Sequence, residues 1–288
     1  MDRLLECALF VVGLAFGSFL NVCVSRIPHG RSVVFPPSRC PGCDAGIRWY
    51  DNIPLLSWLV LRGRCRDCGE RISLRYPAVE LLTAMLFVAC YVAFGSTWLT
   101  IKFCVFVFLL IGLIFMDAEA GLLPREFTYT GIVLGLGFCW IVPTDSAATV
   151  FLLRLFGRPV PAEHLLSLLD AALGGLVGAG FFYLAWALYY LLRKAHGLGF
   201  GDIALMGMAG AFLGLKLIVL VIALAPITSV FYIAFLFVRN AIGPGDQQNE
   251  VGKPFLGREI PFGVFLGACS LLAVFAGEAM WTWYLGMF

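Results

Sequence analysis

Long apolar segments alternate with short polar connections along almost the whole chain. A membrane-spanning helix needs about 20 mostly apolar residues. Within these segments apolar residues follow one another without the period-2 alternation of outer-membrane strands. The pattern therefore predicts an all-α polytopic membrane protein with about eight transmembrane helices. The predicted helices cover residues 4–24, 77–94, 98–116, 127–143, 168–192, 203–214, 216–238 and 262–285.

The composition agrees with this pattern. Hydrophobic residues make up 61% of the chain without glycine, whereas ordinary soluble domains have about 45–50% with glycine counted. Charged residues are 13%, about half of the usual ~25%. The formal net charge is only +2. A soluble domain, a disordered chain and a basic nucleic-acid binder are therefore excluded, and the lipid bilayer is the expected partner.

Positive charges predict the orientation. The largest polar stretch, residues 25–76, directly follows the first predicted helix and contains nine Arg. With eight helices, the connections on the same side as this stretch carry 15 of the 20 Lys and Arg residues, and the other side carries 5. Because cytoplasmic loops are enriched in Lys and Arg, we expect the polar stretch to face the cytoplasm and both termini to lie outside. The first segment has no basic flank before it, so a retained anchor is expected rather than a signal peptide.

Four of the ten Cys lie in this polar stretch as two Cys-x-x-Cys pairs with 21 residues between them: Cys40, Cys43, Cys65 and Cys68. This spacing is typical of a four-thiolate zinc site. Disulfides are disfavoured in a reducing compartment, and no βαβ pattern indicates a thioredoxin-like dithiol. Four thiolates leave no open position on the metal, so we expect one structural Zn²⁺ per chain that folds the loop.

Two Asp residues lie at predicted helix ends on the cytoplasmic side. Asp117 closes the third helix, and Asp202 opens the sixth after Gly199-Phe200-Gly201. Ionisable groups at the membrane boundary are costly and usually functional, although Asp202 also suits a plain helix N-cap. The glycines allow an extended peptide to approach closely. If folding brings the two carboxyls into hydrogen-bond reach, they share a proton, and one can activate a water while the other protonates the substrate.

Other hydrolase motifs are absent. The sequence has three His and neither His-Glu-x-x-His nor Gly-x-Ser-x-Gly, so zinc and serine proteases have no support. Aspartic peptide hydrolysis by Asp117 and Asp202 remains the primary hypothesis. The alternatives are a transporter or channel that uses the two Asp as ion or proton sites, and a zinc-dependent scaffold without catalysis. Glu119 ranks second as the acid, and Asp170 and Glu278 are expected to be boundary residues. Glu80 could bind the methyl donor or the amine of the substrate, or have an interface or structural role, which is the favoured interpretation.

The order of motifs resembles the type IV prepilin peptidases, the bifunctional leader peptidases and N-methyltransferases of pilus and type II secretion systems. The matching residues are Gly17-Ser18-Phe19-Leu20-Asn21-Val22, Arg26-Ile27-Pro28, the two Cys pairs, Asn52-Ile53-Pro54-Leu55-Leu56-Ser57-Trp58, Tyr76-Pro77-Ala78-Val79-Glu80, the two Asp segments and Ile260-Pro261-Phe262-Gly263.

The resemblance implies that Asp117 and Asp202 are the catalytic pair. It implies cleavage of the short basic leader of prepilins or type II secretion pseudopilins at the cytoplasmic face of a bacterial inner membrane. N-methylation of the new N-terminal residue with S-adenosylmethionine as methyl donor is implied too, with residues 18–76 as the first place to look for the donor site. The predicted organisation is then a first helix (1–24), a cytoplasmic zinc-binding loop domain (25–76) and a seven-helix aspartic peptidase membrane domain (77–288). Residues 144–167 and 240–258 have no predicted role.

Overall fold

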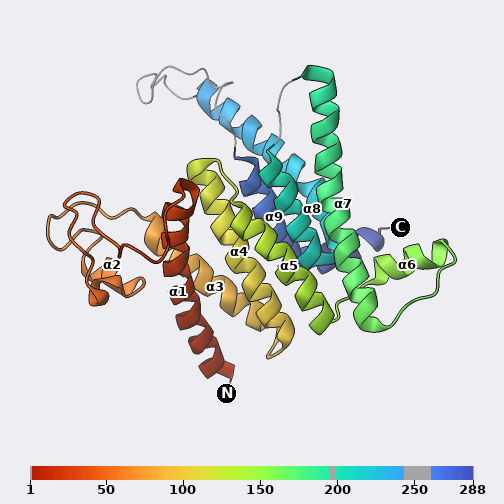
Figure 1. Cartoon of the computed structure of the whole chain (residues 1–288), viewed down its shortest axis with the longest axis horizontal. Helices are drawn as coiled ribbons and strands as arrows, with labels where there is room; N and C mark the ends of the chain where they lie inside the picture. Colours follow the sequence, from red (N-terminus) through yellow and green to blue (C-terminus); the bar gives the residue numbers. More distant parts are fainter. Residues whose placement is uncertain (1, 195–198, 243–260, 288) are drawn as a thin grey trace. The chain divides into compact units, whose positions relative to one another are not determined.

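The computed structural model describes residues 2–194, 199–242 and 261–287. In these ranges the chain is helical, without β-strands (Figure 1), which confirms the all-α prediction. The helices are α1 (Asp2–Arg26), α2 (Leu56–Val60), α3 (Arg75–Phe94), α4 (Trp98–Ala120), α5 (Arg125–Ile141), α6 (Ala147–Leu155), α7 (Glu163–Arg193), α8 (Phe200–Ile242) and α9 (Phe262–Leu285).

All eight predicted apolar segments fall on helices, but two of them, 203–214 and 216–238, lie in the single element α8. Among the described residues, six helices are long and apolar enough to cross a membrane: α1, α3, α4, α7, α8 and α9. Helix α5 has 17 residues. The count of about eight spans therefore stays a prediction. Most of the segment 240–258, which has no predicted role, lies outside the described residues, as do Lys253 and Arg258, two of the 15 cations assigned to the cytoplasmic side.

The chain divides into two compact units, Met1–Met116 and Asp117–Phe288. In the first unit, glycines of α1 let its backbone approach α3. A Cβ placed on Gly17 would lie 2.6 Å from the Glu80 Cα, and one on Gly13 would lie 2.5 Å from the Ala84 Cα. Small residues that allow such contact are the usual basis of helix packing in a membrane. The predicted domain boundaries at 24/25 and 76/77 stay predictions.

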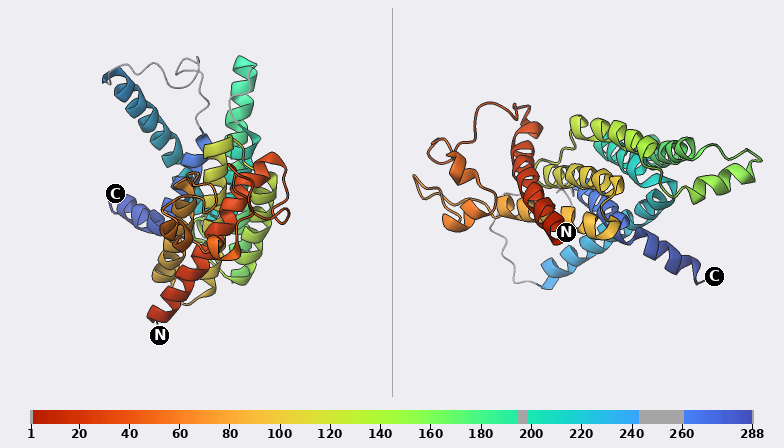
Figure 2. Two further views of the ribbon diagram at one scale, coloured as in Figure 1. Left: turned by 90° about the vertical axis from the view of Figure 1, so that its left-hand side faces the viewer. Right: turned by 90° about the horizontal axis from the view of Figure 1, so that it is seen from below.

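In the second unit, α8 is the central helix and packs against α5, α7 and α9. Helices α7 and α8 run side by side in the views of Figures 1 and 2. Their backbones meet at glycines. A Cβ on Gly174 would lie 2.6 Å from the Gly210 carbonyl oxygen, and one on Gly178 would lie 2.5 Å from the Met206 carbonyl oxygen. This contact fixes the position of the first turns of α8.

A break at Gly214 interrupts α8, where φ is 76° and ψ is 179°. A helix that starts again needs partners for its first N–H groups. The carboxylate of Asp170 on α7 supplies one, because its Oδ2 accepts the amide N–H of Leu215 at 3.3 Å while Oδ1 accepts the Thr149 hydroxyl at 2.5 Å. Asp170 is 2% exposed. It is therefore an interior helix cap rather than the boundary residue expected from the sequence.

Replacing Gly210 with Ala tests the contact between α7 and α8. The new methyl group would meet the Gly174 carbonyl. We therefore expect the free energy of unfolding of G210A to be about 1–3 kcal/mol lower than that of the wild type, which is the usual cost of overpacking. Thermal or denaturant unfolding of the purified protein measures this. G207A is the matched control, since a Cβ there meets its nearest neighbours, the Ala179 Cβ and the Ile132 Cδ1, at ordinary contact distances of 3.5 and 3.6 Å. Equal stability of G210A and G207A would contradict the described packing.

Candidate functional site

The four Cys of the polar stretch form one cluster in the first unit. The sulfurs of Cys40, Cys43, Cys65 and Cys68 all lie within 4.8 Å of one another, and the Cys40 and Cys68 sulfurs are 3.7 Å apart. Four thiolates around Zn²⁺, at about 2.3 Å each, stand about 3.8 Å apart in a tetrahedron. The geometry and the donor set therefore fit a tetrahedral thiophilic metal ion.

The two Cys-x-x-Cys turns have the same backbone design. In each, the amide four residues after the first Cys donates to the carbonyl of that Cys: Asp44 to Cys40 at 2.9 Å and Gly69 to Cys65 at 3.1 Å. Both donor residues have positive φ, 56° and 75°. An isolated antiparallel bridge flanks each turn. Two equivalent turns thus present their sulfurs to one point.

Backbone amides act on the sulfurs of the second turn. Hydrogen bonds from the amides of Cys68 and Asp67 lower the pKa of the Cys65 thiol to about 7. The thiolate is the form of cysteine that binds metal. Cys65 is thus prepared as a ligand by its own turn.

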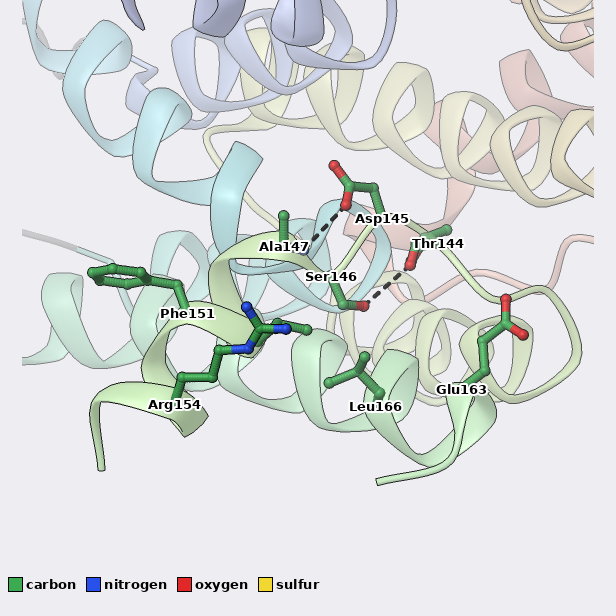
Figure 3. Close-up of a pocket in the computed structure, with 9 residues that line it drawn as sticks. Thr144, Asp145, Ser146, Ala147, Phe151, Arg154, Glu163 and Leu166 are labelled. Atoms are coloured by element: carbon green, nitrogen blue, oxygen red, sulfur yellow. Dashed lines mark hydrogen bonds between the residues drawn. The ribbon is translucent and has the colours of Figure 1, made fainter. Parts of the chain in front are cut away.

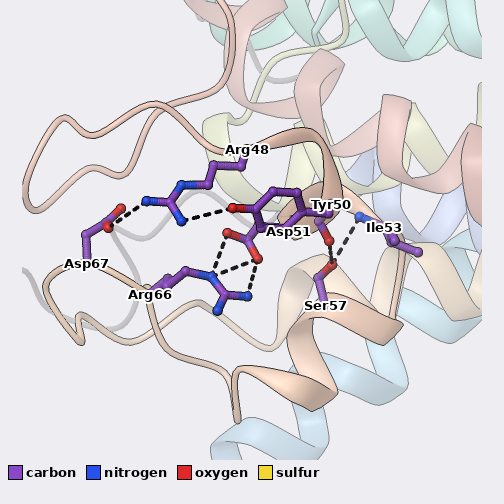
Figure 4. A network of polar contacts seen from close by, with 7 residues as sticks. All are labelled: Arg48, Tyr50, Asp51, Ile53, Ser57, Arg66 and Asp67. Atoms are coloured by element: carbon purple, nitrogen blue, oxygen red, sulfur yellow. Dashed lines mark hydrogen bonds and ion pairs between the residues drawn. The ribbon is translucent and has the colours of Figure 1, made fainter.

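Polar side chains join the second turn to the segment before α2 (Figure 4). The Arg66 guanidinium forms a bidentate ion pair with Asp51, in which Nη2 donates to Oδ1 at 2.6 Å and Nε donates to Oδ2 at 2.9 Å. The hydrogen bond and charge of Arg66 lower the pKa of the Asp51 carboxyl. Arg48 bonds the Tyr50 hydroxyl at 2.9 Å and lies 3.7 Å from Asp67. Bidentate pairs of this kind hold geometry as well as charge.

Glu80 ties this stretch to helix α3. Its Oε2 accepts the amide N–H of Leu55 at 2.7 Å, and Glu80 is 7% exposed. Leu55 has φ 61° and ψ −47°, a conformation that a non-glycine residue adopts only when its surroundings enforce it. This contact is consistent with the structural interpretation of Glu80.

Asp117 lies near the end of α4 and is 6% exposed. Its Oδ2 accepts the amide N–H of Val264 at 3.0 Å. Val264 belongs to the first turn of α9, whose N-cap residue Pro261 makes no side-chain cap. A carboxylate at a helix N-terminus satisfies an orphan N–H and faces the positive end of the helix dipole. A Cβ on Gly263 would lie 2.8 Å from the same oxygen, so this contact requires the bare backbone of glycine.

Asp202 is in the first turn of α8 and is 9% exposed. Leu123, in the turn after α4, fills the space beside it: a Cβ on Gly201 would lie 2.7 Å from the Leu123 Cβ, and one on Gly263 would lie 3.0 Å from its Cδ1. The ends of α4, α8 and α9 thus converge, and the charge of Asp117 acts on the Asp202 carboxyl. Two Asp that are 85 positions apart in the sequence share one site in the second unit.

The remaining predicted acids stand apart from this pair. Glu119 is exposed, which favours Asp117 over it. Glu278 lies elsewhere in the second unit, where it pairs with Lys216. Leu123 and Val264 were not identified as site residues from the sequence. The motif Ile260-Pro261-Phe262-Gly263 is part of the family resemblance, but nothing in the sequence pattern places it against Asp117, and its Ile260 lies outside the described residues.

Comparison with known proteins assigns the family. Residues 11–94 match the bacterial Peptidase A24 N-terminal domain, and residues 81–234 match the type IV leader peptidase family. The chain belongs to the type IV leader peptidase family. The first match contains the four clustered Cys, and the second contains Asp117 and Asp202. This confirms the resemblance seen in the motifs.

Three relatives of this leader peptidase carry the name "Prepilin leader peptidase/N-methyltransferase". The protein of Myxococcus xanthus (strain DK1622) is 38% identical over 84% of this chain and 66% of its own length. That of Aeromonas hydrophila is 33% identical over 97% of this chain and 93% of its own length. That of Neisseria gonorrhoeae is 32% identical over 96% of this chain and 93% of its own length. No solved structure matches the chain.

Proposed function

We propose that this leader peptidase removes the basic leader of type IV prepilins or type II secretion pseudopilins by two-aspartate hydrolysis. The observation that carries the proposal is the buried pair of Asp117 and Asp202 at three converging helix ends. The names of the relatives supply the substrate class. A transporter site would be expected near the bilayer midplane, so the position of the pair at helix ends favours a peptidase.

The chemistry needs one carboxylate as base and the other as acid. We assign the base to Asp117, because the Val264 amide already holds it as a hydrogen-bond acceptor. Asp117 takes a proton from a water, whose oxygen forms a bond to the scissile carbonyl carbon, while Asp202 gives its proton to the carbonyl oxygen. When the tetrahedral intermediate collapses, the C–N bond breaks and Asp117 gives the proton that it took from water to the leaving amine. Asp202 regains its proton from a hydroxyl of the intermediate, so the pair returns to its starting state.

The surroundings of the pair suit a peptide at the membrane boundary. Gly201 and Gly263 leave bare backbone on both sides of Leu123, which permits the approach of an extended chain. A substrate with its apolar segment in lipid and its basic leader in water would present the bond between them at this depth. We place the Asp pair and the Cys stretch on the cytoplasmic face of a bacterial inner membrane, with both termini periplasmic, on the charge asymmetry.

D117N and D202N test the peptidase. Each replacement keeps the shape of the side chain but removes proton transfer, so we expect cleavage of a purified prepilin to fall roughly 10²–10⁴-fold. Mass spectrometry of both products measures cleavage, and an unchanged melting temperature shows that the variants are folded. E119Q is the matched control and should cleave normally. Near-wild-type processing by either Asn variant would refute the assignment.

We also propose that Zn²⁺ is the metal of the four-Cys cluster and that it is structural. Four thiolates close a tetrahedral shell, and the metal supplies folding energy to a stretch with few large buried side chains. We expect one zinc per purified chain by elemental analysis, and its loss in C40S with faster proteolysis within residues 25–76. C7S, which alters an exposed thiol outside the cluster, should retain the zinc. Absence of zinc from the wild-type chain would contradict the proposal.

The second activity, N-methylation of the new N-terminal residue with S-adenosylmethionine, is proposed from the names of the relatives. The described residues contain no strand, and so no strand–helix cradle for the donor. We therefore assign no residue to it. The wild-type chain should add one methyl group to a processed pilin in the presence of the donor. D117N given an already cleaved pilin should do so too, and no gain in mass with the wild type would refute the activity.

A further inference from the structure

A pocket of about 530 Å³ lies in the second unit (Figure 3). Its lining begins at Thr144, just after the end of α5 at Ile141, whereas Asp117 precedes the start of α5. The 17 residues of α5 put roughly 25 Å between the two ends. Pockets of about 300–1,000 Å³ are the usual size of small-molecule sites. The proposed hydrolysis makes no use of this pocket. Its lining includes Thr144, Ser146, Phe151, Arg154, Glu163 and Leu166.

The pocket lies where the chain leaves one apolar helix and enters the next. Helix α5 ends at Ile141 and α7 begins at Glu163, and α6 projects sideways from the end of α7 (Figures 1 and 2). Phe151 and Leu155 on α6 are each 67% exposed, and Phe156 just after it is 74% exposed. A short helix with exposed apolar and aromatic side chains at such a boundary lies in the membrane interface. We therefore place the mouth of the pocket at the level of lipid headgroups.

Some charged side chains of the pocket pair with other side chains of the protein, and others do not. The Asp145 carboxylate accepts the Ala147 amide at 3.1 Å and lies 3.4 Å from the Lys216 ammonium, which also bonds Glu278 at 2.5 Å. Arg154 and Glu163, by contrast, form no ion pair with any residue that the structure describes. In the view of Figure 3 they lie on opposite sides of the pocket.

We propose that this pocket binds the headgroup of an aminophospholipid, with its phosphate on Arg154 and its ammonium on Glu163. One free cation and one free anion match a zwitterion. An anionic glycerol headgroup would leave Glu163 without a partner and beside negative charge. A choline headgroup cannot donate a hydrogen bond to Glu163. Phe151 and Leu166 supply the apolar wall for the start of the acyl chains.

Native mass spectrometry of the full chain in detergent tests the proposal. The probes are short-chain phosphatidylethanolamine, phosphatidylglycerol and phosphatidylcholine, added separately. We expect the wild type to bind phosphatidylethanolamine about tenfold more tightly than the other two. R154Q should lose this binding about tenfold, and E163Q should lose the preference over phosphatidylglycerol. R158Q, which removes a nearby exposed cation outside the lining, should bind like the wild type.

Equal binding of the three lipids would overturn the proposal. So would the finding that R154Q and E163Q both bind the three lipids as the control R158Q does. If R154Q fails to fold, E163Q alone decides the question. Soluble phosphoethanolamine that binds as tightly as the lipid would show a site for a free metabolite and would overturn the lipid assignment. Prepilin cleavage by all three variants should equal that of the wild type, so the outcome is independent of the proposed peptidase.

Discussion

The hydrogen bond from the Val264 amide to the Asp117 carboxylate organises the second unit around its site. A helix that begins in an apolar environment has N–H groups without partners, and each unsatisfied group there costs several kcal/mol. Asp117 removes part of this cost for α9. Because its side chain is short, the first turn of α9 must come to the end of α4, and Gly263 allows the approach. Leu123 then contacts both Gly263 and Gly201, which brings the first turn of α8, and with it Asp202, to the same place.

The same solution recurs twice elsewhere in the chain. Asp170 accepts the Leu215 amide where α8 restarts after Gly214, and Glu80 accepts the Leu55 amide in a strained turn. In all three cases a nearly buried carboxylate from one helix satisfies a backbone N–H of another segment. Each of these three carboxylates therefore lies where a helix begins or where the backbone departs from regular helix. A buried acid is therefore not by itself a sign of catalysis here. What sets the Asp117 site apart is that its charge acts on a second carboxyl, that of Asp202.

Much of this arrangement could be predicted from the sequence, and the limits have physical causes. Hydropathy located the helices because the solvent is lipid, and the Cys cluster followed from spacing because a short turn presents two sulfurs to one metal. The sequence pattern predicts separate helices over 203–214 and 216–238, whereas the structure has the single element α8 with one non-helical residue, Gly214, and no polar connection. The position of Asp170 toward the outer face predicts a boundary residue, and the sequence does not reveal its role as a cap because the helix start that it caps lies 45 residues away. The Val264 contact, across 147 residues, leaves no local pattern at all.

The double role of Asp117 determines which substitution can separate structure from chemistry. Truncation to Ala would remove both the acceptor for the Val264 amide and the proposed base, so a loss of cleavage could come from a displaced α9. Asn retains a carbonyl oxygen that accepts the same N–H, yet it cannot take a proton from water. Asp202 differs, because no inter-helix hydrogen bond from its carboxylate is needed to hold α8, whose position is set by the glycine contacts with α7. Loss of the Asp117 side chain should therefore disturb the fold more than loss of the Asp202 side chain. This asymmetry is expected for a pair in which one acid is held by the backbone of another helix and the other faces the substrate.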